Sequence, residues 1–144
     1  MKVYLDVCCL GRLFEESDQT RMRRESDAIQ KILDLDVAIV GSEIVRREVS
    51  RDTDDERRNG VEMLVEEING SFVRINARIV IRGTEPEALG FGGFDALHIA
   101  CPESAGATFL LTTDDKMLRR AKRLADKLNV KIENPVRWVL DCLP

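Results

Sequence analysis

Residues 107–128, ATFLLTTDDKMLRRAKRLADKL, join an apolar run to two aspartates and then to an amphipathic segment. The run at 107–113 predicts a buried strand, because a short apolar run bounded by a turn is typical of one. Residues 115–128 repeat apolar side chains at helical spacing, which predicts a helix with one face in the core. Asp114 therefore stands between a strand and a helix, where parallel sheets place their ligands.

The same alternation of strand and helix patterns extends along the rest of the chain. We expect strands at 2–6, 37–40, 71–75 and 130–133, and helices at 21–35, 43–50, 56–68, 78–89, 94–104 and from Pro135 onward. Asn69-Gly70 is interpreted as the end of the third helix, and Gly83 and Pro86 are expected to interrupt the helix at 78–89. The alternation predicts an α/β fold, a three-layer sandwich with a mostly parallel central sheet of about five strands, in a single domain over residues 1–144.

Composition and charge narrow the function classes. The net charge of −4 argues against a general nucleic-acid-binding protein, although it allows an enzyme that handles nucleic acid through a bound metal ion. The chain has no long apolar run and no signal-peptide pattern, so we expect no membrane partner and a cytoplasmic location. The four cysteines form no CxxC pair, which predicts reduced thiols and makes a zinc site improbable.

Four carboxylates lie at or near the predicted carboxyl ends of strands. Asp6 ends the first strand, Asp114 follows the fourth, Glu48 lies about one turn into the helix after the second, and Asp95 opens the helix before the fourth. Singly, such residues often cap helices, but no helical pattern begins directly after Asp6. Clustered carboxylates repel one another, and a divalent cation such as Mg²⁺ or Mn²⁺ would remove that repulsion. The pattern therefore predicts a metal site.

The segments KVYLD, SEIVRRE, FDALHIACPESAGA and FLLTTDDKMLRRA together resemble a PIN domain, over essentially the whole chain. The resemblance implies the strand order 3-2-1-4-5 and a cluster of four acids that binds Mg²⁺ or Mn²⁺ and hydrolyses RNA phosphodiesters. Asp6, Glu48, Asp95 and Asp114 match the four catalytic acids. Asp6, Asp95 and Asp114 would ligate the metal, and Glu48 would help to place the metal or the attacking water.

Other positions near the predicted site carry weaker signals. Thr112 matches the hydroxyl residue that often precedes the last acid of the family, and Asp115 is an additional acidic candidate. Arg12 and Lys116, together with Thr112, are the candidate substrate-binding residues, because cations there could hold a phosphate. Many PIN domains have Asn at the position of Cys8, and cysteine cannot make the two hydrogen bonds of an amide.

The remaining residues near the site are interpreted as structural. We interpret Cys8 and Cys9 as packing residues, since an acidic surrounding disfavours a reactive thiolate. His98, the only histidine, follows Asp95 by three residues and so could face the site, but it is expected to have a structural or surface role. One histidine cannot build a histidine-ligated metal centre.

Two functional hypotheses remain open. The first is a metal-dependent ribonuclease that leaves a 3′-hydroxyl and a 5′-phosphate. Its resemblance to VapC-type toxins implies RNA as a partner, a cognate antitoxin and a homodimer. The second is a non-catalytic PIN-like module that binds protein and keeps its acids for capping. A phosphoryl-transfer protein is disfavoured, because the sequence has neither a DxDxT motif nor paired acids at the end of the first strand.

Overall fold

The computed structural model describes residues 1–68 and 70–143. The described residues form a five-stranded sheet in the order β3-β2-β1-β4-β5, and every pair of neighbouring strands is parallel. The strands are β1 (Lys2–Leu5), β2 (Ala38–Ser42), β3 (Phe72–Val73), β4 (Phe109–Leu111) and β5 (Lys131–Glu133). The α/β fold with a parallel five-stranded sheet is thus confirmed, as is the strand order that the resemblance implied.

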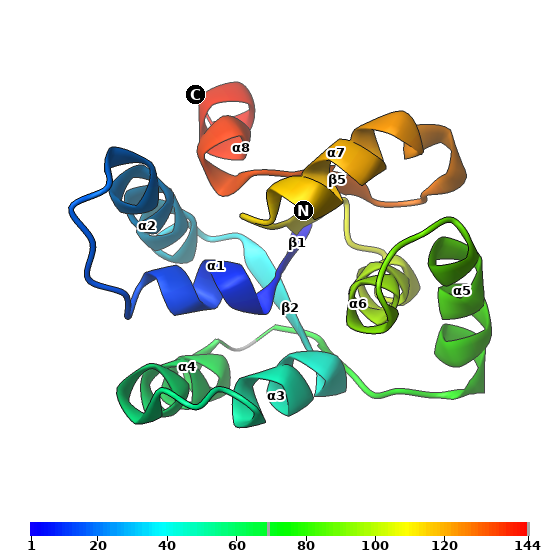
Figure 1. Ribbon diagram of the computed structural model, residues 1–144, viewed down its shortest axis with the longest axis horizontal. Helices are drawn as coiled ribbons and strands as arrows, with labels where there is room; N and C mark the ends of the chain where they lie inside the picture. The colour runs from blue at the N-terminus through cyan, green and yellow to red at the C-terminus, as the bar shows by residue number, and fades with distance from the viewer. Residues whose placement is uncertain (69, 144) are drawn as a thin grey trace.

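Helices cover both faces of this sheet (Figure 1). Helices α1 and α2 lie on one side, where α8 packs against α2, while α5 and α6 pack against each other on the other side. None of the described helices is long and apolar enough to cross a membrane. The helices are α1 (Val7–Arg12), α2 (Thr20–Leu33), α3 (Glu43–Ser50), α4 (Asp55–Glu67), α5 (Ala77–Ala88), α6 (Gly93–Ser104), α7 (Asp115–Arg123), the 3₁₀ turn η1 (Ala125–Lys127) and α8 (Pro135–Cys142).

The two central strands form the middle of the core. Val3 and Tyr4 in β1, like Leu110 and Leu111 in β4, have no exposed side-chain surface. Central strands of a parallel sheet are covered on both faces, which is why they read as continuous apolar runs. Trp138 of α8 is also buried and meets Phe109 edge to face. The polar residues that follow these strands are therefore held on a rigid base.

The structure corrects the expectation that no helix follows Asp6. Helix α1 begins at Val7, and the Asp6 side chain caps it by accepting a hydrogen bond from the backbone N–H of Val7. A helix of six residues has too few positions to show a periodic apolar stripe. Asp6 therefore ends a strand and caps a helix at the same time.

Two other expectations about helices differ from the structure, and a third falls partly on a residue outside those described. The predicted helix at 115–128 ends at Arg123 and continues only as η1, because the chain must turn back to enter β5. Helix α5 is continuous through Gly83 and Pro86. Pro86 lies in its last turn, and Gly83 packs closely against Leu97 of α6. Helix α4 ends at Glu67, and Asn69 of the predicted Asn69-Gly70 cap lies outside the described residues.

Candidate metal and active site

Asp6 lies at the carboxyl edge of the sheet, where β1 and β4 end side by side. Leu5 is in register with Leu111, and the Asp6 backbone N–H donates to the Leu111 carbonyl over 3.0 Å. This pairing brings Thr112 next to Asp6, and the Thr112 hydroxyl donates to Asp6 Oδ2 over 2.9 Å. Asp6 Oδ1 accepts from Val7 N over 2.8 Å. Each oxygen of this buried carboxylate is therefore held by a donor of fixed position.

Asp114 stands at the start of α7 and is exposed. Its Oδ1 accepts from the backbone N–H groups of Lys116 and Met117, so the side chain caps the helix. Its own backbone N–H donates to the Thr112 hydroxyl over 3.2 Å. Thr112 thus bonds to the side chain of one candidate ligand and to the backbone of another, and it fixes their relative position.

His98 lies beside these acids in the interior, so of the structural and surface roles expected from sequence the surface role is wrong. The side chain is fully buried, and its Nε2 lies 3.1 Å from Glu48 Oε2 and 3.6 Å from Asp6 Oδ1. Its Nδ1 lies 2.6 Å from the hydroxyl of Tyr4, a buried residue of β1. Asp6, Glu48 and His98 each offer one ligand atom, and these atoms lie within 4.8 Å of one another.

The sequence carries one signal for this position of His98. It follows Asp95 by three residues in α6, a spacing that puts both side chains on the same helix face. That spacing could not show that the hydroxyl of Tyr4, from a different element, would lie within hydrogen-bond distance of His98 Nδ1. The sequence therefore suggested the direction of His98 but not its role.

Asp95 lies in the first turn of α6, where Gly92 rather than Asp95 is the N-cap. It lines a cavity of about 300 Å³ together with Asp6, Glu48 and Asp114. The structure therefore brings all four predicted acids to one cavity, although they come from four separate parts of the chain.

Electrostatics in this cavity favour a bound cation. Burial raises the pKa of Asp95 to about 6, and the negative charges of Asp6 and Asp114 add to that shift. Burial lowers the pKa of His98, but the neighbouring carboxylates, Asp6 foremost, outweigh it and raise the pKa overall. The raised pKa of His98, and part of the rise for Asp95, come from the negative charge of the neighbouring carboxylates. Carboxylate oxygens and an imidazole nitrogen are donors that divalent metals accept, so the side chains fit such an ion.

A comparison of the sequence with family models gives a match to the PIN domain over residues 3–124. The chain belongs to the PIN domain family. Among solved structures it is similar to that of the Mycobacterium tuberculosis toxin VapC20, described as cleaving the sarcin-ricin loop. That match has a TM-score of 0.62 and 10% identity and covers 81% of this chain and 93% of VapC20, so it supports the fold alone. No curated protein matches this chain significantly.

The three candidate substrate-binding residues of this PIN domain differ from one another in exposure and in their partners. Thr112 is fully buried, and its contacts are with Asp6, Cys8 and the Asp114 backbone. Lys116 is exposed in the first turn of α7, directly after the site. Arg12 instead donates to Glu25 over 3.0 Å and to Glu15 over 2.7 Å, so its guanidinium is held in ion pairs.

Asp115 and Cys8, two further residues singled out from the sequence, differ in whether they contact the site. Asp115 accepts two hydrogen bonds from Arg21, at 2.7 and 2.8 Å, and does not line the cavity of the four acids. The Cys8 thiol, at the position where many PIN domains have Asn, lies 3.5 Å from Asp6 Oδ2 and 3.3 Å from the Thr112 hydroxyl. Cys8 therefore contacts the site directly rather than only filling space.

Residues 51–60 carry a dense run of mixed charges, and part of this run lines the cavity. Asp52 and Arg57 form a bidentate ion pair at its wall, and Arg57 also lies 3.8 Å from Glu15. No motif in the sequence points to these side chains. Arg57 adds one positive charge to an otherwise acidic lining.

Proposed function

We propose that this PIN domain is a divalent-metal-dependent endoribonuclease. The observation that carries the proposal is the convergence of Asp6, Glu48, Asp95 and Asp114 on one cavity at the carboxyl edge of the sheet. Membership of the PIN family supports it, since nucleases belong to that family. The similar structure of VapC20, described as a toxin that cleaves the sarcin-ricin loop, agrees with it at the level of fold.

In this proposal Asp6, Asp95 and Asp114 hold Mg²⁺ or Mn²⁺. Such an ion supplies an activated water and neutralises charge on a phosphodiester. Thr112 keeps Asp6 and Asp114 in fixed relation, and His98 holds Glu48 at the same cavity. Ligands held by a second layer of hydrogen bonds bind metal more tightly than free ones.

Phosphate contacts would come from cations at the rim of the site. Lys116 is exposed and directly follows the acids, whereas Arg12 would have to leave Glu15 and Glu25 to reach a phosphate. RNA is the proposed substrate. A cognate antitoxin, a homodimer and a cytoplasmic location complete the proposal by likeness to VapC toxins.

Metal binding can be tested without relying on catalysis. We expect millimolar Mn²⁺ to raise the unfolding midpoint of the wild type, since a ligand at 100-fold excess over Kd stabilises by about 2.7 kcal/mol. Asp6→Asn and Asp114→Asn are expected to lose that response. Asp126→Asn serves as the matched control, because Asp126 is exposed in η1, before β5, and lies outside the acid cavity.

RNA cleavage is then measured on the same four proteins. Cleavage by the wild type and Asp126→Asn, but not by the other two variants, would support the ribonuclease. If Mn²⁺ leaves the wild type unchanged while Asp6→Asn and Asp114→Asn melt higher than wild type, the acids are uncompensated charges. That result would favour the non-catalytic, protein-binding module.

A further inference from the structure

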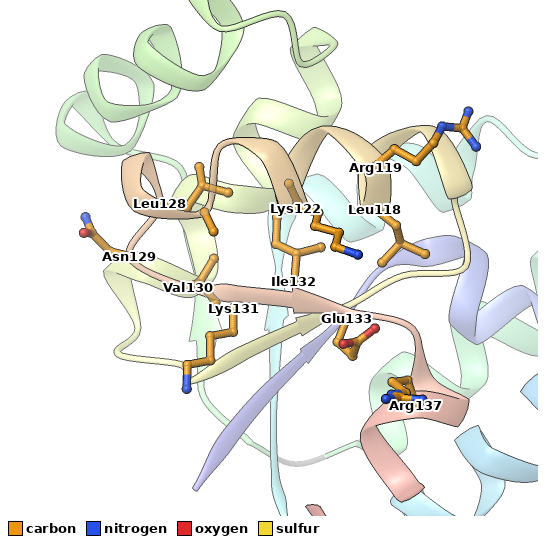
Figure 2. Close-up of a pocket in the computed structure, with 12 residues that line it drawn as sticks. Leu118, Arg119, Lys122, Leu128, Asn129, Val130, Lys131, Ile132, Glu133 and Arg137 are labelled. Carbon is orange, nitrogen blue, oxygen red and sulfur yellow. The ribbon is translucent and has the colours of Figure 1, made fainter. Parts of the chain in front are cut away.

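A second hollow, which we call the β5-edge groove, runs beside the last strand of the sheet (Figure 2). It has a volume of about 790 Å³ and is lined by residues of α7, η1, β5 and α8. None of its lining residues lines the acid cavity. In Figure 2 Leu118, Lys122 and Ile132 lie on the α7 side of β5, whereas Lys131 and Arg137 lie on the other side. The groove therefore follows the edge of the strand.

This edge of the sheet has free pairing capacity. Within residues 1–68 and 70–143, β5 pairs with β4 alone. Lys131 donates its backbone N–H to Thr108, and the Glu133 carbonyl accepts from Thr112, both over 3.0 Å. Backbone groups alternate in direction along a strand, so those of Ile132 point away from β4. An unpaired row of this kind is a template for an added strand.

The side chains beside β5 determine which side chains an added strand would need. Leu118, Leu128 and Ile132 give the groove an apolar wall on the α7 side. Arg119, Lys122, Lys131 and Arg137 supply four cations against one acid, Glu133. Of these four, only Arg137 has a carboxylate partner within 4 Å among the described side chains, Asp141. This local excess of positive charge stands against the net charge of −4 of the whole chain.

We propose that the β5-edge groove binds an extended segment of a partner protein, in which apolar residues alternate with acidic ones, as a sixth strand beside β5. Alternate side chains of a strand point to opposite faces, so apolar residues would meet Ile132 and Leu118 while carboxylates meet Lys131 and Arg137. Backbone pairing at a sheet edge gives affinity, and the flanking side chains give specificity.

Two other occupants fit the groove less well. Single-stranded RNA is held by a positively charged groove together with aromatic side chains on which its bases stack. The described residues that line this groove supply the charge but no aromatic side chain. A second copy of this chain would bring its own four cations to the same place, and like charges repel. Lys131 on a three-residue edge strand also discourages pairing between copies, as edge lysines commonly do.

The test uses a ten-residue fluorescent peptide of alternating valine and glutamate, with fluorescence anisotropy as the readout. We expect the full-length protein to bind it, and the double variant Lys131→Glu/Arg137→Glu, which reverses the two cations that would meet the carboxylates, to bind it at least tenfold more weakly. Both positions are exposed, so the exchange should leave folding intact. The matched control is Arg23→Glu/Arg24→Glu, which reverses two exposed charges on α2 and should bind as the wild type does.

Further measurements separate strand addition from simple charge attraction. Amide NMR signals of Ile132 and its neighbours in β5 should shift on binding, whereas a valine–lysine peptide should not bind. The proposal is overturned if the acidic peptide fails to bind, or if both double variants weaken it equally. It is also overturned if single-stranded RNA alone binds this groove, or if the wild type is a dimer that Lys131→Glu/Arg137→Glu dissociates.

Discussion

Thr112 is a buried residue whose single hydroxyl serves two candidate metal ligands. It donates to Asp6 Oδ2 and accepts from the backbone N–H of Asp114. Thr112→Val should therefore weaken Mn²⁺ binding by roughly 10- to 100-fold, as the loss of a hydrogen-bond partner of a ligand typically does. Titration of Mn²⁺ against the unfolding midpoint measures this change.

Thr112→Ser is the matched variant, because it keeps the hydroxyl and removes only a methyl group. It should retain most of the Mn²⁺ affinity. If Thr112 acts only on RNA, both variants would bind Mn²⁺ normally and Thr112→Val would change only the KM for RNA. That pattern would return Thr112 to the substrate-binding role expected from sequence.

Three helices meet at one buried carboxylate, Glu25. The Glu25 side chain of α2 accepts from Arg12 of α1 over 3.0 Å and from Asn134, the N-cap of α8, over 2.7 Å. Arg21 adds a longer contact at 3.4 Å and also reaches Asp115 at the start of α7. Arg12 therefore connects α1 to α2, and Arg21 connects α2 to the start of α7.

Removing this carboxylate should destabilise the protein without touching the metal site. Glu25→Ala leaves Asn134 without this acceptor and Arg12 with Glu15 alone, and breaking a buried pair costs about 3 kcal/mol. Urea unfolding measures the loss. Glu16→Ala, an exposed acid in the connection before α2, is the control and should change stability by less than about 0.5 kcal/mol. Equal effects of the two changes would contradict the structural role of Glu25.

The predicted helices agree with the structure where a local pattern sets both ends, and they differ where a tertiary feature sets an end. Helix α3 was predicted with its observed bounds, and α2, α4 and α6 to within two residues at each end. Helix α1 was missed, because its six residues show no stripe and its start depends on the Asp6 cap. The end of α7 was placed too late, because the turn into β5 rather than local pattern stops it.

The folded protein as a whole should lose stability as the pH rises, when metal is absent. The pKa of Asp95, raised to about 6, lies above its unfolded value of about 4, and the pKa of His98 is raised as well. The folded state then binds more protons than the unfolded state, so stability falls with rising pH. The stabilisation from His98 is present below about pH 6.5 and is lost as the pH rises through its folded pKa. That from Asp95 grows as the pH falls from about 6 toward 4.

Unfolding midpoints in EDTA at pH 6, 7 and 8, at constant ionic strength, measure this dependence. The midpoint should be highest at pH 6. Asp95→Asn should reduce the slope, whereas Asp126→Asn should leave it as in the wild type. A midpoint that rises from pH 6 to pH 8 would show that the four acids are not closely clustered in the metal-free protein.

Local pattern was enough to predict the alternation of strands and helices, the parallel sheet and the strand ends at which the acids lie. Those features depend on short-range periodicity and on the rule that carboxyl ends of parallel strands share one edge. The strand order came from the family resemblance, and the register of β1 with β4 then brought Asp6 to Thr112. The side-chain partners, in contrast, depend on packing between distant elements. That packing places His98 between Tyr4 and Glu48, and it pairs Arg12 with Glu25. Such contacts join residues far apart in the chain, so no local sequence signal could specify them.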